Sequence, residues 1–162
     1  MAKDNTKTKK GFTIIEVVLV LAIAGLIFLM VFVALPALQR SQRDTQRRDD
    51  MARVLSQLAQ YQANNSGNVP DSAATLTNFF TDYLKVGGDK FENPSTGTAY
   101  TSNFKACTSN ECAPTTTPTD TGKIYYYTNA TCEGEKPSYK SGARNVAITL
   151  KLEGAGTYCG HN

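Results

Sequence analysis

The stretch that decides the fold begins Gly11-Phe12-Thr13-Ile14-Ile15-Glu16 and continues as the uncharged run Val17–Leu35. A helix rises about 1.5 Å per residue, so this run is long enough to cross the hydrocarbon core of a bilayer. It is longer than the apolar region of an ordinary secretory signal and no A-x-A cleavage site follows it, so we expect the helix to persist. Glu16 is the one ionisable residue between Phe12 and Leu38. A carboxylate at the bilayer centre costs about 2.5–3.5 kcal/mol on insertion scales, so this one needs a specific role.

The positive charge of the chain is confined to its first residues. The 162 residues carry a formal net charge of +3, and residues 1–11 account for all of it, with four lysines against one aspartate. Residues 12–162 therefore sum to zero, and no basic stripe with interleaved aromatic residues follows the apolar run. The sequence gives no indication of nucleic-acid binding. The length allows one modest globular domain and an appendage.

Two residues weaken the apolar helix. Gly25 costs about 1 kcal/mol of helix propensity relative to alanine. Pro36 removes a backbone donor and crowds the preceding turn. We therefore expect a kink or a locally melted stretch near Phe32–Pro36.

A second helical pattern follows, because residues 39–64 contain no Gly or Pro. Asp44 and Arg48, spaced i,i+4 with the acid first, can form a favourable ion pair on this helix. The segment 64–70 is rich in turn residues and ends the helix. Apolar residues at i, i+3, i+4, i+7 and i+10 form one stripe that we expect a globular head to bury: Met51, Val54, Leu55, Leu58 and Tyr61.

The remaining residues predict a small α+β head. Asp71 or Ser72 caps a short helix that runs to Leu84. Short turns favour an antiparallel sheet packed on the apolar stripe of the long helix. Within Tyr125–Tyr127 we expect one ring in the core and its neighbours at the surface. Three runs have β character: Ala99–Cys107, Lys123–Asn129 and Asn145–Glu153.

The four cysteines are Cys107, Cys112, Cys132 and Cys159, all in the last third of the chain. An even number beyond an export segment indicates disulfides formed in an oxidising compartment. Sequence does not fix the pairing, since four cysteines allow three connectivities. The sequential pairs Cys107–Cys112 and Cys132–Cys159 are the simplest. A zinc site is disfavoured by the absence of C-x₂-C spacing and by a single histidine, His161.

Basic residues do not settle the topology of the membrane helix. Four lysines precede the apolar run and five arginines follow it by residue 53, so the positive-inside rule gives no clear orientation. The cysteines do indicate one, because they require the C-terminal side to lie outside the reducing cytoplasm.

No set of residues predicts catalysis. The one histidine is near the end of the chain, and no phosphate-binding glycine loop or calcium loop is present in the sequence. The densest acidic group, Asp82, Asp89 and Glu92, lacks a ligand motif and is best interpreted as a solvated loop face. We expect no enzyme activity, no cofactor and no metal site.

The segment Lys9-Lys10-Gly11-Phe12-Thr13-Ile14-Ile15-Glu16, with the apolar run behind it, resembles the class III signal peptide of type IV prepilins and their pseudopilin relatives. The resemblance covers residues 9–40. It implies that a prepilin peptidase in the membrane cuts after Gly11 on the cytoplasmic face and N-methylates Phe12. It also implies that Glu16 pairs with the N-terminal amine of a neighbouring subunit. The alternative is a plain signal anchor in which Glu16 extends toward the membrane surface.

The chain matches the family pattern at one helix-weakening position and departs from it at the other. Gly25 stands where many pilins have a glycine, whereas the family's proline position holds Val33. The proline comes three residues later, at Pro36, so we place the segment that would melt and stretch during assembly closer to the head.

The resemblance divides the chain into a leader (1–11), a transmembrane and filament-core helix (12–38), its continuation (39–65) and a globular head (66–162). Within the head, residues 66–122 form a loop region, and residues 123–162 hold the sheet and a disulfide. The implied fold is the α+β type IV pilin fold, with a long kinked helix whose C-terminal half packs on a small antiparallel sheet.

The implied function is that of a structural subunit of a type IV pilus, held in the cytoplasmic membrane with the head outside. An assembly ATPase and a platform protein would polymerise it with other copies and minor pilins into a helical extracellular filament. A minor pilin or a pseudopilin of a secretion or DNA-uptake system is an alternative. A membrane-anchored extracellular binding module that never polymerises is another.

Five charged residues lie where the filament core would meet the heads: Arg40, Arg43, Asp44, Arg47 and Arg48. We expect inter-subunit ion pairs there, with binding to lipid head groups as the alternative.

Overall fold

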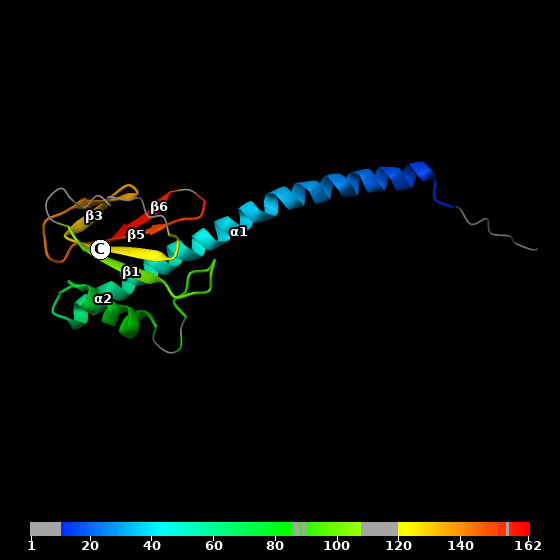
Figure 1. The fold of residues 1–162 in the computed structure, drawn as a ribbon. Coiled ribbons are helices and arrows are strands. Elements are labelled where there is room, and N and C mark those ends of the chain that lie inside the picture. Colours follow the sequence, from blue (N-terminus) through cyan, green and yellow to red (C-terminus); the bar gives the residue numbers. More distant parts are fainter. Residues whose placement is uncertain (1–10, 86–87, 89, 108–119, 155) are drawn as a thin grey trace, which may run out of the picture. The chain divides into compact units, whose positions relative to one another are not determined.

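The computed structural model describes residues 11–85, 88, 90–107, 120–154 and 156–162. The chain divides into two compact units, Met1–Gln39 and Arg40–Asn162. The first element, α1 (Ile14–Asn64), has residues in both units. Figure 1 colours the chain from its N-terminus to its C-terminus and labels α1, α2, β1, β3, β5 and β6.

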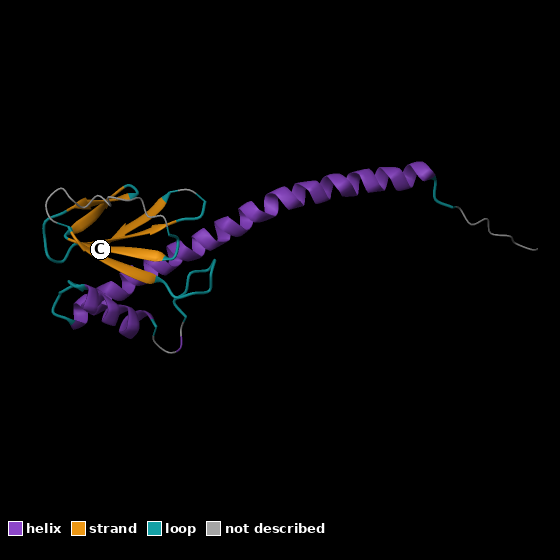
Figure 2. Cartoon of the chain, in the orientation of Figure 1, coloured by secondary structure: helices purple, strands orange, loops and turns teal. Residues whose placement is uncertain are grey.

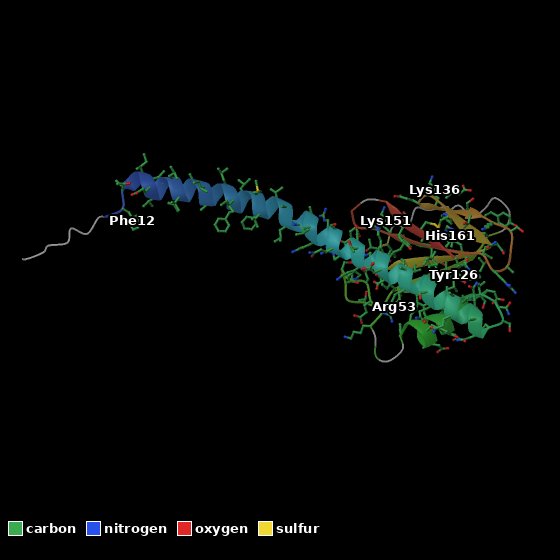
Figure 3. All side chains as sticks on the ribbon, turned by 180° about the vertical axis from the view of Figure 1, so that it is seen from behind. Phe12, Arg53, Tyr126, Lys136, Lys151 and His161 are labelled. Atoms are coloured by element: carbon green, nitrogen blue, oxygen red, sulfur yellow. A yellow bond between two sulfur atoms is a disulfide. The ribbon has the colours of Figure 1, made fainter. Side chains whose placement is uncertain are left out.

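In the first unit, α1 is apolar on every side. Its large side chains from Phe12 to Leu38 are exposed, Phe12 by 91%. Figure 3 shows these side chains projecting from the helix without any cover. Among the described residues, α1 is the one helix long and apolar enough to cross a membrane, judged by length and composition alone.

Helix α1 continues through both residues that were expected to weaken it. Pro36 lies inside the helix, and Phe32–Pro36 is helical throughout, so the expected local melting is absent from the single chain. One proline removes one donor from the ladder, and the turns on either side hold the helix together. Stretching of this segment during filament assembly stays a prediction.

In the second unit, the predicted stripe of α1 enters the core. Met51, Val54 and Leu58 have no exposed surface, and Leu55 and Tyr61 pack beside them. These residues share one face because they recur at helical spacing. The predicted stripe is confirmed.

A left-handed turn ends α1. Gly67 has φ +81°, and its N–H donates to the carbonyl of Gln62 at 2.7 Å, an arrangement that satisfies a carbonyl at the helix end. A Cβ on Gly67 would lie 2.9 Å from the guanidinium carbon of Arg144. The close approach therefore brings a cation to the negative end of the helix dipole.

The short helix expected after the turn is α2 (Ala73–Phe79), and a π-helical turn, η1 (Phe80–Leu84), follows it directly. Ser72 caps α2 in a capping box with Thr75, which confirms one of the two predicted caps.

Among the described residues, the main sheet has the order β1-β2-β5-β6, and β3 and β4 form a separate hairpin. Figure 2 shows the strands and helices of the head in separate colours. The strands are β1 (Thr101–Ala106), β2 (Lys123–Thr128), β3 (Ala130–Glu133), β4 (Lys136–Tyr139), β5 (Val146–Lys151) and β6 (Thr157–His161).

The sheet is mixed, which corrects the expectation of a wholly antiparallel one. β1 pairs with β2 in parallel, while β2–β5 and β5–β6 are antiparallel. A parallel pair needs a long connection in place of a tight hairpin, and 16 residues separate β1 from β2. The three predicted runs correspond to β1, β2 and β5. The strands β3, β4 and β6 were not predicted.

The tyrosines of β2 are buried on both faces of the sheet. Tyr126 belongs to the core that contains the α1 stripe, as one ring was expected to do. Tyr125 and Tyr127 are not at the surface, since they belong to a second cluster with Cys107 and Ala130. The chain from β3 onward covers that second face, which no local pattern in β2 indicates.

A disulfide joins Cys132 of β3 to Cys159 of β6, with their Cα atoms 5.9 Å apart. This confirms one predicted pair. Cys107 is also half of a disulfide. The predicted pair Cys107–Cys112 cannot be followed further, because Cys112 lies outside the described residues.

Candidate functional site

The start of α1 holds the residues predicted for processing and assembly. Gly11 and Phe12 are exposed and precede the first helical residue, Ile14, so the bond between them lies in accessible non-helical chain. A peptidase can bind such a segment in an extended conformation without unwinding the helix.

Thr13 and Glu16 form a reciprocal capping arrangement. The N–H and hydroxyl of Thr13 donate to Oε2 of Glu16 at 2.9 and 2.7 Å, and the N–H of Glu16 faces the Thr13 hydroxyl oxygen at 3.4 Å. This is the capping box of a helix N-terminus, with Thr13 as N-cap and Glu16 three residues later. The unpaired N–H groups of the first turn further favour a carboxylate at this position.

The capping box uses one oxygen of the Glu16 carboxylate. Among the described residues, Oε1 accepts no hydrogen bond. A carboxylate has lone pairs on both oxygens, so Glu16 retains the capacity to bind a further donor such as an ammonium group. The capping box reduces the cost of placing the Glu16 charge at the edge of an apolar segment. The carboxylate can still bind a partner through Oε1.

A second charged site lies in the head, where α1 meets two turns. Arg47 is fully buried and donates through Nη1 to Asp44 at 2.9 Å and through Nη2 to Glu153 at 2.6 Å. Nη2 also lies 2.8 Å from the side-chain oxygen of Asn93 and 2.9 Å from the hydroxyl of Ser95. Buried charges need this many partners, because each one loses its hydration.

Two further contacts complete this ion network. Arg43 donates two hydrogen bonds to Oε2 of Glu153, from Nε at 3.0 Å and from Nη2 at 2.6 Å. Asp44 accepts the backbone N–H groups of Glu153 and Gly154, each at 2.8 Å. Two cations and two anions therefore join α1 to the turn between β5 and β6.

The network holds both acids in the ionised form. Hydrogen bonding by Arg43, with a further contribution from Arg47, lowers the pKa of Glu153 from 4.5 to about 2 against the effect of burial. Burial raises the pKa of Asp44, but the two backbone N–H groups and Arg47 outweigh it, and this pKa lies below its ordinary value. The hydrogen bond to Glu153 raises the pKa of Arg43.

Three of the five charged residues predicted to form inter-subunit ion pairs have partners within the chain, and their inter-subunit role stays a prediction. Arg43, Asp44 and Arg47 pair within one chain, where burial in the head favours them. Asp44 pairs with Arg47 in place of Arg48 because Arg47 faces the core. Arg40 and Arg48 remain exposed.

Sequence reasoning missed Glu153, Asn93 and Ser95. One signal was available, since Asp44 and Arg47 precede Met51 by seven and four residues and so lie on the face of the buried stripe. Charged residues on that face must find partners inside the fold.

Within the described residues, no group of three or more His, Cys, Asp or Glu side chains is arranged to hold a metal ion. The described residues offer two separate features. One is an accessible Gly11–Phe12 bond followed by a carboxylate at the start of α1, and the other is the charged network within the head.

Residues 6–32 match the family model for the prokaryotic N-terminal methylation motif. This motif is the class III signal peptide of type IV pilins, and the match confirms the resemblance seen in the sequence. The long apolar helix followed by a small mixed sheet also matches the α+β architecture of the pilin fold. No curated protein and no solved structure matches the chain.

Proposed function

We propose that this chain, a pilin- or pseudopilin-like prepilin substrate by its methylation motif, is a filament-forming subunit of a type IV pilus. In this proposal prepilin peptidase cuts after Gly11 and methylates Phe12. The subunit waits in the cytoplasmic membrane with its head outside. An assembly ATPase and a platform protein then polymerise it with other copies and minor pilins.

The observation that carries the proposal is the matched motif, with Glu16 at the start of the helix. Cleavage creates a positively charged amine on Phe12, close in sequence to the carboxylate of Glu16. In an apolar filament core both charges are costly, and an amine from a neighbour can offset that cost only in one register. The pair would therefore fix the position of one subunit on the next.

The exposed helix surface supports polymerisation. Large apolar side chains cover α1 on every side from Phe12 to Leu38. A helix of this kind is stable in lipid or when it packs against similar helices. Since lipid is as apolar as the helix, packing and the Glu16 pair must select the bundle over the membrane.

The head supports placement outside the cytoplasm. The Cys132–Cys159 disulfide joins two strands of the head, and such bonds persist in oxidising compartments. Arg40 and Arg48 remain our proposed inter-subunit contacts, because both are exposed at the start of the second unit. They would pair with acids of a neighbouring head or with lipid head groups before extraction.

The test is to shear the surface of cells that produce the chain and to analyse the released material by electron microscopy and mass spectrometry. The proposal expects filaments composed of this chain, beginning at methylated Phe12. A processed chain that stays with the membrane and forms no filaments would identify a pseudopilin or minor pilin. A membrane-bound chain that keeps residues 1–11 would refute both and leave an anchored binding module.

A further inference from the structure

A polar groove lies on the surface of the head between α1 and η1. It has a volume of about 450 Å³, within the range of small-molecule sites. Figure 3 labels Arg53, which lies on α1 at this groove. The groove is lined by Arg53, Gln57, Gln60, Asn64, Asp82 and Tyr83.

The α1 wall of the groove is a row of amides. Gln57, Gln60 and Asn64 have the spacing i, i+3, i+7 and lie on the helix surface away from the buried stripe. Successive amides are therefore displaced by about 4.5 and 6 Å along the helix axis. Each amide presents one acceptor oxygen and two donor hydrogens.

The opposite wall is the π-helical turn η1, which carries Asp82 and Tyr83. Turns of this kind are rare and occur often at functional sites. The Tyr83 ring is held in place by Phe79, stacked at 5.6 Å, and by Tyr61, edge-on at 5.4 Å.

Two contacts join the walls. Nη2 of Arg53 donates to the carbonyl of Leu84 at 3.0 Å, and the amide of Asn64 donates to the Tyr83 hydroxyl at 3.3 Å. The groove is thus formed before any ligand arrives, which lowers the entropic cost of binding.

The lining restricts the class of ligand. Arg53 and Asp82 balance in charge, so the groove favours neither a polyanion nor a cation, and one carboxylate is too few for a divalent metal. A polar lining does not suit an apolar ligand. Amides that both donate and accept suit hydroxyl groups, which do the same.

We propose that this groove binds a neutral, extended oligosaccharide. The row of amides would hydrogen-bond the hydroxyls of successive sugar units, because the helix repeats its amides at intervals comparable to one sugar unit. The Tyr83 ring supplies an apolar surface for the C–H face of a sugar. This binding is independent of filament assembly, so it can hold even where the pilin proposal fails.

The test uses the full chain in dodecylphosphocholine micelles, because this detergent carries no sugar that would compete. Chitopentaose and cellopentaose are titrated into ¹⁵N-labelled protein and followed by NMR, with a Gly-Ser decapeptide as a non-sugar probe. We expect saturable binding of at least one pentasaccharide with Kd about 1 mM or tighter, with shifts at the side-chain amides of Gln57, Gln60 and Asn64.

Variants locate the binding. Gln57→Ala and Gln60→Ala should each weaken binding at least about fivefold, since each removes a hydrogen-bonding side chain. Gln46→Ala is the matched control, an exposed glutamine of the same helix outside the groove, and should leave Kd unchanged. Asp82→Asn should alter Kd by less than about twofold, since a neutral ligand does not need the charge.

Three results would overturn the proposal. One is the absence of saturable binding by both pentasaccharides up to about 10 mM. Another is a loss of binding in Gln46→Ala equal to that in Gln57→Ala. The third is saturation by the decapeptide alone, which would make the groove a peptide site. Near-ultraviolet circular dichroism of each variant verifies that the head is folded.

Discussion

Replacing Glu153 by glutamine tests the ion network of the head most directly, because glutamine has the shape of a protonated glutamic acid. The side chain is 16% exposed and contacts Arg43 and Arg47. Its pKa is about 2 in the folded protein against an ordinary value of 4.5. That difference corresponds to about 3 kcal/mol of stability at neutral pH, at roughly 1.4 kcal/mol per pKa unit.

The sign of the pH dependence follows from the direction of the shift. A carboxyl with a lowered folded pKa stabilises the fold fully above pH 4.5, and this contribution is lost as the pH falls through about 2. Glu153→Gln lacks the contribution at every pH. The difference in unfolding free energy between the native chain and the variant should therefore be about 3 kcal/mol at pH 7 and near zero below pH 2.

The assay is urea unfolding of the full chain in dodecylphosphocholine micelles, followed by the near-ultraviolet circular dichroism of the head tyrosines. Urea is uncharged and leaves the ion pairs unscreened. Glu133→Gln, at an exposed acid of β3, is the control and should change stability by less than about 0.5 kcal/mol. A Glu153→Gln difference that stays constant from pH 7 to pH 2 would show that shape, and not charge, holds the turn.

Substitutions elsewhere in the chain give three separate tests. Gly67→Ala should destabilise the head by more than about 1 kcal/mol, since the new side chain strains a positive φ and meets the guanidinium of Arg144. Gly134→Ala is the control: Gly134 has φ +63° and open space around it, so this variant measures the cost of the backbone strain alone. Replacing both Cys132 and Cys159 by alanine should cost about 3 kcal/mol in the same urea assay, and an equal midpoint with and without the disulfide would contradict this. Glu16→Ala should leave cleavage and methylation intact, as judged by mass spectrometry, but abolish filaments in the sheared fraction; normal filaments would refute the pairing argument.

Local signals predicted the elements that local physics determines. The stripe from Met51 to Tyr61 was readable because helical periodicity repeats within a few residues. Ser72 was readable as a cap because its partner, Thr75, is three residues away. The start of the apolar helix and the position of Glu16 were likewise predicted from neighbouring residues.

The features that were not predicted depend on contacts between residues far apart in the sequence. The parallel pairing of β1 with β2 joins strands that are more than a dozen residues apart, so no local pattern predicts it. Strand β6 contains Gly160, which weakens its strand character in the sequence. The burial of Tyr125 and Tyr127 depends on segments that follow β2 in the chain. The contact between Arg47 and Glu153 was not predicted, because the two residues are 106 positions apart in the sequence.

The same separation sets an order of events during biogenesis. Arg43 and its partner Glu153 are 110 residues apart, so the contact closes one of the longest loops that the chain can form. Synthesis proceeds from the N-terminus, so the apolar helix leaves the ribosome long before the turn between β5 and β6 that binds it through Glu153. If the head is exported as proposed, the charges on α1 keep their water until that turn has crossed the membrane, and the helix would insert without an attached head. Under the proposed function, completion of the C-terminal strands, β6 and its disulfide among them, would be the step that turns an inserted helix into a subunit fit for extraction.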